Sequence, residues 1–96
     1  MNMAHETSSS KMDLTTFFLS ISSAAFMGLG AISPPGASEP SVDLELARQN
    51  IDLLELMMEK TKGNRTPEED RLIERLLFET RLKYVEKKRD HSKLSG

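Results

Sequence analysis

The sequence contains no cysteine and no tryptophan, and histidine is scarce, because His5 and His91 are the only two and stand near opposite ends. Without cysteine the chain forms no disulfide and offers no thiolate for catalysis or for binding a metal. A carboxylate metal site of the helical-bundle type needs a Glu-x-x-His pair, which neither histidine provides. The serines and threonines of the N-terminal part have no base beside them to activate a nucleophile. We therefore expect no enzyme, no catalytic residue, no metal site and no cofactor.

An excess of charge of either sign is also absent, because the formal net charge is -2 over 96 residues. No overall field attracts nucleic acid or anionic lipid, so such binding would need a local patch. Apolar residues make up 38% and charged residues 29%, proportions typical of a folded globular domain. A chain of this length has room for one small domain with a limited core, so self-association has to be considered.

Polar and proline-rich stretches divide the chain. Residues 1–11 are polar, rich in serine and without periodicity, which predicts a disordered tail. Residues 33–41 contain three prolines and a glycine, which predicts an exposed linker that no helix crosses. We expect a single small helical domain over residues 12–90 and a second disordered tail over residues 91–96.

Apolar residues recur at helical spacing in three segments, and we expect helices at about residues 13–29, 42–62 and 67–89. In the second and third segments the apolar residues cover about half of the helix circumference, which is more than one neighbouring helix can cover. The predicted fold class is therefore all-α: an apolar N-terminal helix, a proline-rich linker and an antiparallel helical hairpin, assembled as a homo-oligomeric helical bundle.

The third segment carries two apolar faces. One face contains Leu76 and Leu77 among others, and the second contains Phe78, Leu82 and Val85. Asn50 interrupts the apolar surface of the second segment, either as a residue bonded to a backbone carbonyl or as one that fixes helix register and oligomer number. The residues that we expect to pack at interfaces are Phe17, Phe18, Ile21, Leu46, Asn50, Leu53, Met57, Phe78, Leu82 and Val85.

The stretch KTKGNRTPEE, residues 60–69, predicts a hairpin turn. Gly63 supplies a left-handed residue after one helix, and Asn64 tolerates the same conformation. Thr66 caps the next helix, Pro67 takes its first position, and Glu69 completes a capping box with Thr66. The alternative is a phosphate cradle, but the acidic residues that follow would repel an anion, and the flanking glycine of a P-loop is missing.

The stretches MDLTTFFLS and LARQNIDLLELMMEKTKGNRTPEEDRLIERLLFETRLKYVE together resemble a short bacterial family known as domain of unknown function 1844. The resemblance extends over nearly all of residues 12–86, and the pattern IDLLELxxEKTKGNxTxEE carries most of its specificity. It implies a small helical bacterial protein, and it brings no reaction, cofactor or catalytic residue. It also places the apolar N-terminal segment inside the domain.

Several functions stay open on the sequence alone. The leading expectation is a cytoplasmic, non-enzymatic protein-interaction or oligomerisation module, which associates with itself as a dimer or a larger assembly or binds an unidentified protein partner. The alternative is a membrane-peripheral or exported factor that uses the apolar first helix as an anchor or signal, although that helix is shorter than a membrane span requires. Nucleic-acid binding is less favoured and would use the basic C-terminal end, which contains Arg81, Lys83, Lys87, Lys88, Arg89 and Lys93.

Overall fold

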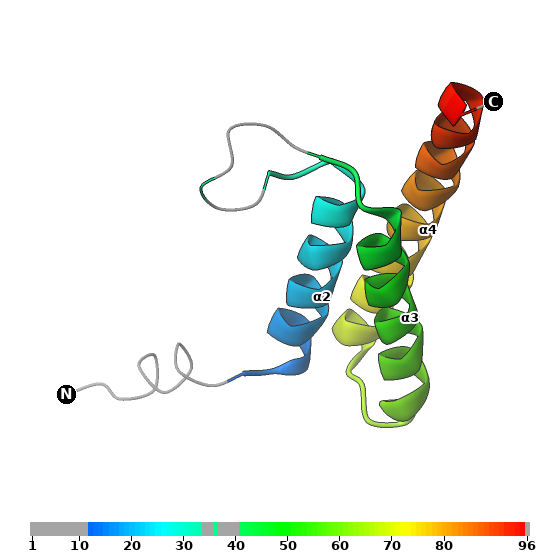
Figure 1. Ribbon diagram of the computed structural model, residues 1–96. Helices are drawn as coiled ribbons and strands as arrows, with labels where there is room; N and C mark the ends of the chain where they lie inside the picture. The colour runs from blue at the N-terminus through cyan, green and yellow to red at the C-terminus, as the bar shows by residue number, and fades with distance from the viewer. Residues whose placement is uncertain (1–11, 34–35, 37–40, 96) are drawn as a thin grey trace.

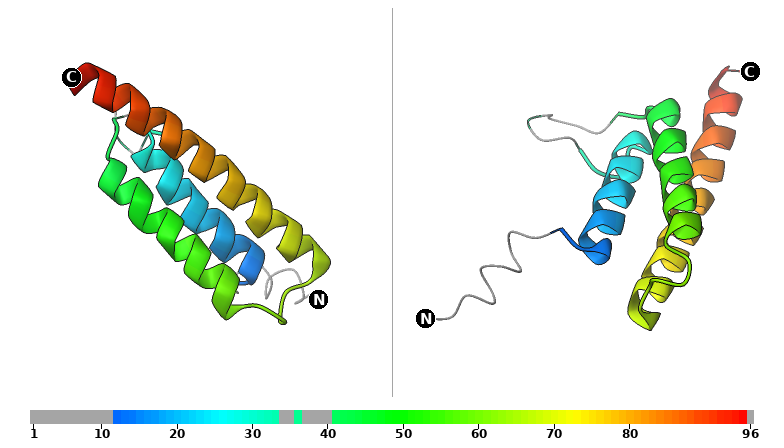
Figure 2. Two further views of the ribbon diagram at one scale, coloured as in Figure 1. Left: turned by 90° about the vertical axis from the view of Figure 1, so that its right-hand side faces the viewer. Right: turned by 90° about the horizontal axis from the view of Figure 1, so that it is seen from below.

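The computed structural model describes residues 12–33, 36 and 41–95, so the tail expected at residues 1–11 lies outside the described part. The described residues form three helices, α2 (Leu14–Gly28), α3 (Leu44–Lys60) and α4 (Pro67–Ser95). Figure 1 and Figure 2 show them side by side, with α3 running opposite to α2 and α4. The chain therefore has the all-α fold that the sequence predicts.

Each helix begins at a side chain that satisfies a free backbone amide. Asp13 Oδ1 accepts a hydrogen bond from the Thr16 amide at 2.8 Å, and Asp43 Oδ1 accepts one from the Leu46 amide at 3.1 Å. Thr66 Oγ1 accepts from the Glu69 amide at 3.1 Å, while Glu69 Oε1 accepts from the Thr66 amide at 2.8 Å. This reciprocal pair is the capping box that the sequence predicts.

Helix α4 is longer than expected. It continues to Ser95, six residues past the predicted end at Arg89, so residues 91–95 extend the helix instead of fraying. The segment after Pro67 contains no proline and no glycine before Ser95, so nothing in its sequence stops the helix. As a result α4 projects beyond the ends of α2 and α3 (Figure 1).

One hydrophobic core lies between the three helices. Phe18 of α2, Leu54 of α3, and Ile73 of α4 have no exposed surface. The buried core cluster consists of Phe18, Ile21, Ala25, Ile51, Leu54, Ile73, Leu76 and Leu77. Fully burying one such large side chain contributes about 1.5–3 kcal/mol, so this cluster is the main source of stability in the single chain.

Helices α2 and α3 approach each other closely where the linker begins and ends. The Asp43 amide donates to the Gly28 carbonyl at 2.7 Å, and Leu29 and Val42 form an isolated antiparallel bridge. Gly28 is buried, and nearby Ala47 is buried as well, so only small residues occupy this contact. The two ends of the proline-rich linker are therefore held together at its base.

The turn between α3 and α4 is stabilised by its own side chains. Gly63 adopts a φ of 85°, the left-handed conformation that the sequence predicts for it. Arg65 lies across the turn with its side chain only 10% exposed. Its guanidinium donates to the Met58 carbonyl, to Thr61 Oγ1 at 2.9 Å and to Asp70 Oδ1 at 2.5 Å. Arg65 thereby connects the end of α3 to the first turn of α4.

Candidate interaction surface on helix α4

Two neighbouring residues of α4 have opposite environments. Leu77 is 2% exposed and packs in the core, whereas Phe78 is 67% exposed. Leu82 and Val85 continue from Phe78 along the same side of the helix and are 50% and 56% exposed. We name these three residues, Phe78, Leu82 and Val85, the α4 strip. Their spacing of four and three residues aligns them along about 10 Å of the helix, since each residue rises 1.5 Å.

The α4 strip lies on the side of α4 that faces away from the bundle. Ile73, Leu77 and Thr80 are buried on the inner side, and at 100° per residue the strip lies almost opposite to them. Figure 1 and the left view of Figure 2 agree that α2 and α3 lie on the same side of α4. No other described element of the chain therefore covers the strip.

A shallow hollow of about 320 Å³ runs along the strip, with Glu74 and Arg81 beside the three apolar residues. Arg81 is fixed in position, because its Nη2 and Nε donate to Glu55 Oε2 of α3 at 2.7 and 3.1 Å. This ion pair is half exposed, so it contributes less than about 1 kcal/mol to stability. The ion pair holds the Arg81 guanidinium at one edge of the hollow.

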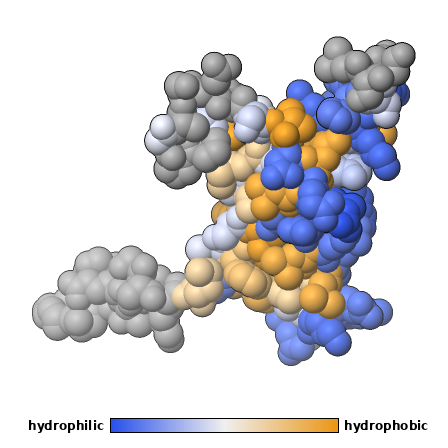
Figure 3. Space-filling view, viewed as in Figure 1, coloured by the Kyte–Doolittle hydropathy of each residue, from blue (hydrophilic) through white to orange (hydrophobic). Residues whose placement is uncertain are grey.

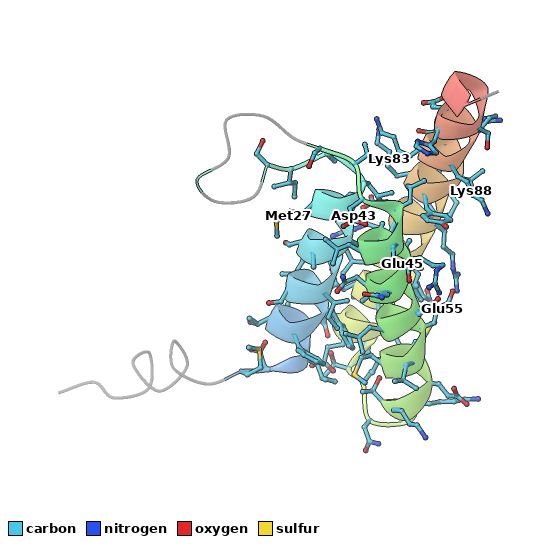
Figure 4. All side chains as sticks on the ribbon, viewed as in Figure 1. Met27, Asp43, Glu45, Glu55, Lys83 and Lys88 are labelled. Atoms are coloured by element: carbon cyan, nitrogen blue, oxygen red, sulfur yellow. The ribbon has the colours of Figure 1, made fainter. Side chains whose placement is uncertain are left out.

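Charge is divided unevenly along α4. Residues 67–80 contain five acidic and two basic side chains, whereas residues 81–95 contain six basic and two acidic ones. Figure 4 places Lys83 and Lys88 on the C-terminal half of α4, and Glu45 and Glu55 on α3. The α4 strip lies at the boundary between the acidic half and the basic half.

The other residues that the sequence assigns to interfaces lie elsewhere. Phe18 and Ile21 are buried in the core of the same chain. Phe17, Leu53 and Met57 are partly buried and pack against that core. These five residues therefore serve the packing of the three helices within one chain.

Leu46 and Asn50 lie near the start of α3. Leu46 is 37% exposed. Figure 3 shows apolar surface over α2 and α3, with charged side chains gathered over α3 and α4. Asn50 Nδ2 donates to the Leu46 carbonyl at 3.0 Å, within one helical turn. Of the two roles that the sequence leaves open for Asn50, the structure shows a hydrogen bond to a backbone carbonyl.

A second hollow, of about 470 Å³, lies between α3 and α4 beside the turn. Met58 and Leu77 contribute apolar surface, and Arg65 and Arg81 contribute charge. Both guanidinium groups already bind acidic side chains, Arg65 at Asp70 and Arg81 at Glu55. These two arginines therefore form ion pairs within the chain.

Two polar residues have roles that the sequence did not indicate. Thr80 is completely buried, and its Oγ1 donates to the Leu76 carbonyl at 2.7 Å. Arg65 gains its partly buried position only because the turn folds back on Met58, seven residues earlier. In both cases a backbone carbonyl accepts a hydrogen bond from the side chain, and the residue types in a sequence do not show which carbonyl will lie within reach.

Exposed charges on α3 form local pairs. Arg48 lies between Glu45 at 2.9 Å and Asp52 at 3.0 Å. The hydrogen bond that Arg48 donates to Glu45, followed by the charges of Glu45 and Asp52, raises the pKa of Arg48. On α2, hydrogen bonds from Thr16 lower the pKa of Asp13 below its ordinary value of 3.8.

The basic C-terminal end is partly occupied by contacts within α4. Lys88 Nζ lies 5.9 Å from the centre of the Tyr84 ring, and Lys83 Nζ lies 4.0 Å from Glu86.

Within the described residues, no three histidine or acidic side chains are grouped closely enough to hold a metal ion. None of the described helices has the length and apolar character needed to cross a membrane.

A family model described as domain of unknown function (DUF1844) matches residues 11–86. The chain belongs to the DUF1844 family. The match confirms the resemblance seen in the sequence, and it spans α2, α3 and α4 as far as Glu86. All three residues of the α4 strip are inside the DUF1844 region, with Val85 one residue before its end. No curated protein and no solved structure matches the chain.

Proposed function

We propose that this DUF1844 protein is a non-enzymatic protein-interaction module whose binding surface is the outer side of α4. The observation that carries this proposal is the exposure of Phe78, Leu82 and Val85 in a chain that already buries a complete core. Large apolar side chains gathered on one side of a helix cost free energy in water, and a binding partner removes that cost. An aromatic residue beside aliphatic ones and an arginine is also a common composition of binding hot spots.

The geometry supports this function better than membrane anchoring by α2. The apolar side of α2 includes Phe18, Ile21 and Ala25, which are all buried against α3 and α4. Inserting this side into a lipid surface would remove α2 from the core and expose Leu54 and Ile73 to water. The α4 strip, in contrast, is available for binding without any change in the fold.

Photochemical crosslinking in the cells that produce the protein tests the proposed function. A photoreactive amino acid placed at Val85, at the C-terminal end of the α4 strip, is expected to form defined adducts with protein. The same group at Ser23, an exposed residue of α2, serves as the matched control. If Val85 gives no adduct beyond those of the Ser23 control, the outer side of α4 is not an interaction surface and the proposal is wrong.

A further inference from the structure

The charge division along α4 identifies a partner for the α4 strip. The acidic half of α4 ends and the basic half begins within the strip, between residues 80 and 81, so the helix has opposite charges on the two sides of that point. A helix with the same pattern, turned end to end, would place basic residues against the acidic half and acidic residues against the basic half. A second copy of this chain has that pattern.

We propose that the α4 strip binds the α4 strip of a second copy, with the two helices antiparallel and related by a twofold axis that passes between Arg81 and Leu82. The proposal deepens the proposed function, because it uses the same surface and names its partner. In this register Phe78 of one copy faces Val85 of the partner subunit, and the two Leu82 side chains meet near the axis. Such isologous contacts are the usual form of a homodimer interface.

Four charged residues beside the strip fit this register, and Arg81, which lies near the proposed axis, already pairs with Glu55 of its own chain. At 100° per residue, Glu74 and Lys88 lie along one edge of the strip, and Arg75 and Glu86 lie along the other. The twofold axis is perpendicular to the two helices, so each edge of the strip meets the same edge of the partner helix. Glu74 therefore approaches Lys88 of the partner subunit, and Arg75 approaches Glu86 of the partner subunit. Each opposite-charge pair occurs twice.

A parallel arrangement of the same two helices is disfavoured by the division of charge along α4. It would place the acidic half, residues 67–80, beside the acidic half of the partner helix, and the basic half, residues 81–95, beside the basic half. Like charges at close range oppose association. Charge therefore selects the antiparallel direction, while the apolar residues supply the binding energy.

The absence of native cysteine permits a direct test of the register by disulfide trapping. The full chain is prepared with a single substitution, Leu82→Cys, Phe78→Cys or Val85→Cys, and oxidised under mild conditions. Leu82→Cys is expected to crosslink with itself, because its two copies are offset by about 1.5 Å along the helix axis. Phe78→Cys alone and Val85→Cys alone are expected not to crosslink, because each pair is offset by about 10 Å, beyond the reach of a disulfide.

An equimolar mixture of the Phe78→Cys and Val85→Cys chains is expected to form the mixed disulfide in high yield. Ser23→Cys on α2 measures crosslinking by random collision, and circular dichroism establishes that each variant is folded. Self-crosslinking of Phe78→Cys above the Ser23→Cys level would indicate a parallel pairing and overturn the register. Failure of both Leu82→Cys and the mixture to exceed that level would overturn the dimer.

Sedimentation of the unmodified chain from about 1 to about 500 µM is expected to show a monomer–dimer equilibrium, because a single helix-to-helix contact is smaller than a standard interface. Leu82→Glu is expected to weaken dimerisation at least tenfold (roughly 1.4 kcal/mol), since it buries an unpaired charge at the axis. Glu74→Lys should weaken it about three- to tenfold, and adding Lys88→Glu in the same chain should restore it.

A monomer at every concentration would overturn this inference. Crosslinking from Val85 to a different protein in cells, together with a monomer in sedimentation, would keep the proposed function and reject the second copy as the partner. No adduct from Val85 in cells, together with a monomer in sedimentation, would reject the two proposals together. The cell-based and purified experiments therefore distinguish failure of the partner from failure of the surface.

Discussion

Gly28 of α2 lies against Ala47 of α3 so closely that a β-carbon on Gly28 would be 2.7 Å from the Ala47 backbone nitrogen. The same β-carbon would be 2.8 Å from the Asp43 carbonyl oxygen. Both neighbouring atoms belong to the backbone and cannot rotate away. The distance between α2 and α3 is therefore set by the absence of a side chain at residue 28.

Gly28→Ala should destabilise the protein by about 1–3 kcal/mol or more, because α2 and α3 would have to move apart or the backbone would have to distort. Chemical denaturation monitored by circular dichroism measures the loss. Ser23→Ala, an exposed substitution on the same helix, should change the free energy of unfolding by less than about 0.5 kcal/mol. Equal stabilities of the two variants would contradict the close contact.

Leu77→Ala and Phe78→Ala form a matched pair on adjacent residues of α4. Leu77→Ala removes a buried side chain and should cost about 2–5 kcal/mol, whereas Phe78→Ala removes a mostly exposed one and should cost less than about 0.5 kcal/mol in the monomer. Denaturation at low protein concentration, where association is negligible, measures both values. The structure would be wrong about which face of α4 is buried if Phe78→Ala were the more damaging change.

Arg65→Lys should destabilise the turn by about 1–3 kcal/mol although it preserves the charge. A lysine cannot reproduce the planar fork that reaches the Met58 carbonyl, Thr61 and Asp70 together. Arg71→Lys is the matched control, because Arg71 is exposed and its nearest acidic partner, Glu68, lies 4.0 Å away. Thermal unfolding of both variants should show a clear loss for Arg65→Lys alone.

Asp13→Ala should show a stability loss that depends on pH. The hydrogen bonds from Thr16 lower the pKa of Asp13 in the folded chain, so its stabilising effect is fully present above its ordinary value of 3.8. The effect is lost as the pH falls below 3.8 through the lower folded-state pKa. The melting temperatures of Asp13→Ala and the unmodified chain should therefore differ at neutral pH and converge in acid.

Asp13→Asn separates the charge from the cap. Its amide oxygen accepts the same hydrogen bond from the Thr16 amide but does not titrate in this range. The difference between Asp13→Asn and Asp13→Ala should consequently stay constant as the pH is lowered, as long as the protein remains folded. The melting temperature of Asp13→Asn relative to Asp13→Ala could instead change with pH as steeply as that of the unmodified chain relative to Asp13→Ala. The Asp13 carboxylate would then not be the cause of the pH dependence.

Local features of the fold could be predicted from the sequence. The capping box of Thr66 and Glu69 and the left-handed Gly63 are each set by residues within one helical turn, so residue type and spacing suffice to find them. The end of α4 was less predictable, because residues 90–95 carry neither a strong stop signal nor an apolar pattern. The helix continues to Ser95 in the absence of a residue that would end it.

Which apolar face of α4 is buried within the chain could be predicted only in part. The sequence shows that α4 has two such faces, but it does not show which one the same chain covers. That choice depends on how α2 and α3 pack around Leu77, and it leaves Phe78 outside. The close contact at Gly28 and the partly buried position of Arg65 could not be predicted for the same reason, since both depend on backbone atoms that only the folded chain brings near.

The contacts that join α2 and α3 at the two ends of the proline-rich linker have a practical consequence for engineering. Because the Gly28–Asp43 hydrogen bond and the Leu29–Val42 bridge already hold α2 and α3 in place, the intervening chain does not have to set their spacing. Gly36 has nothing within 4 Å of the position of an added β-carbon. An epitope or a fluorescent protein inserted at Gly36 should therefore report on the protein in living cells and leave the outer side of α4 unobstructed.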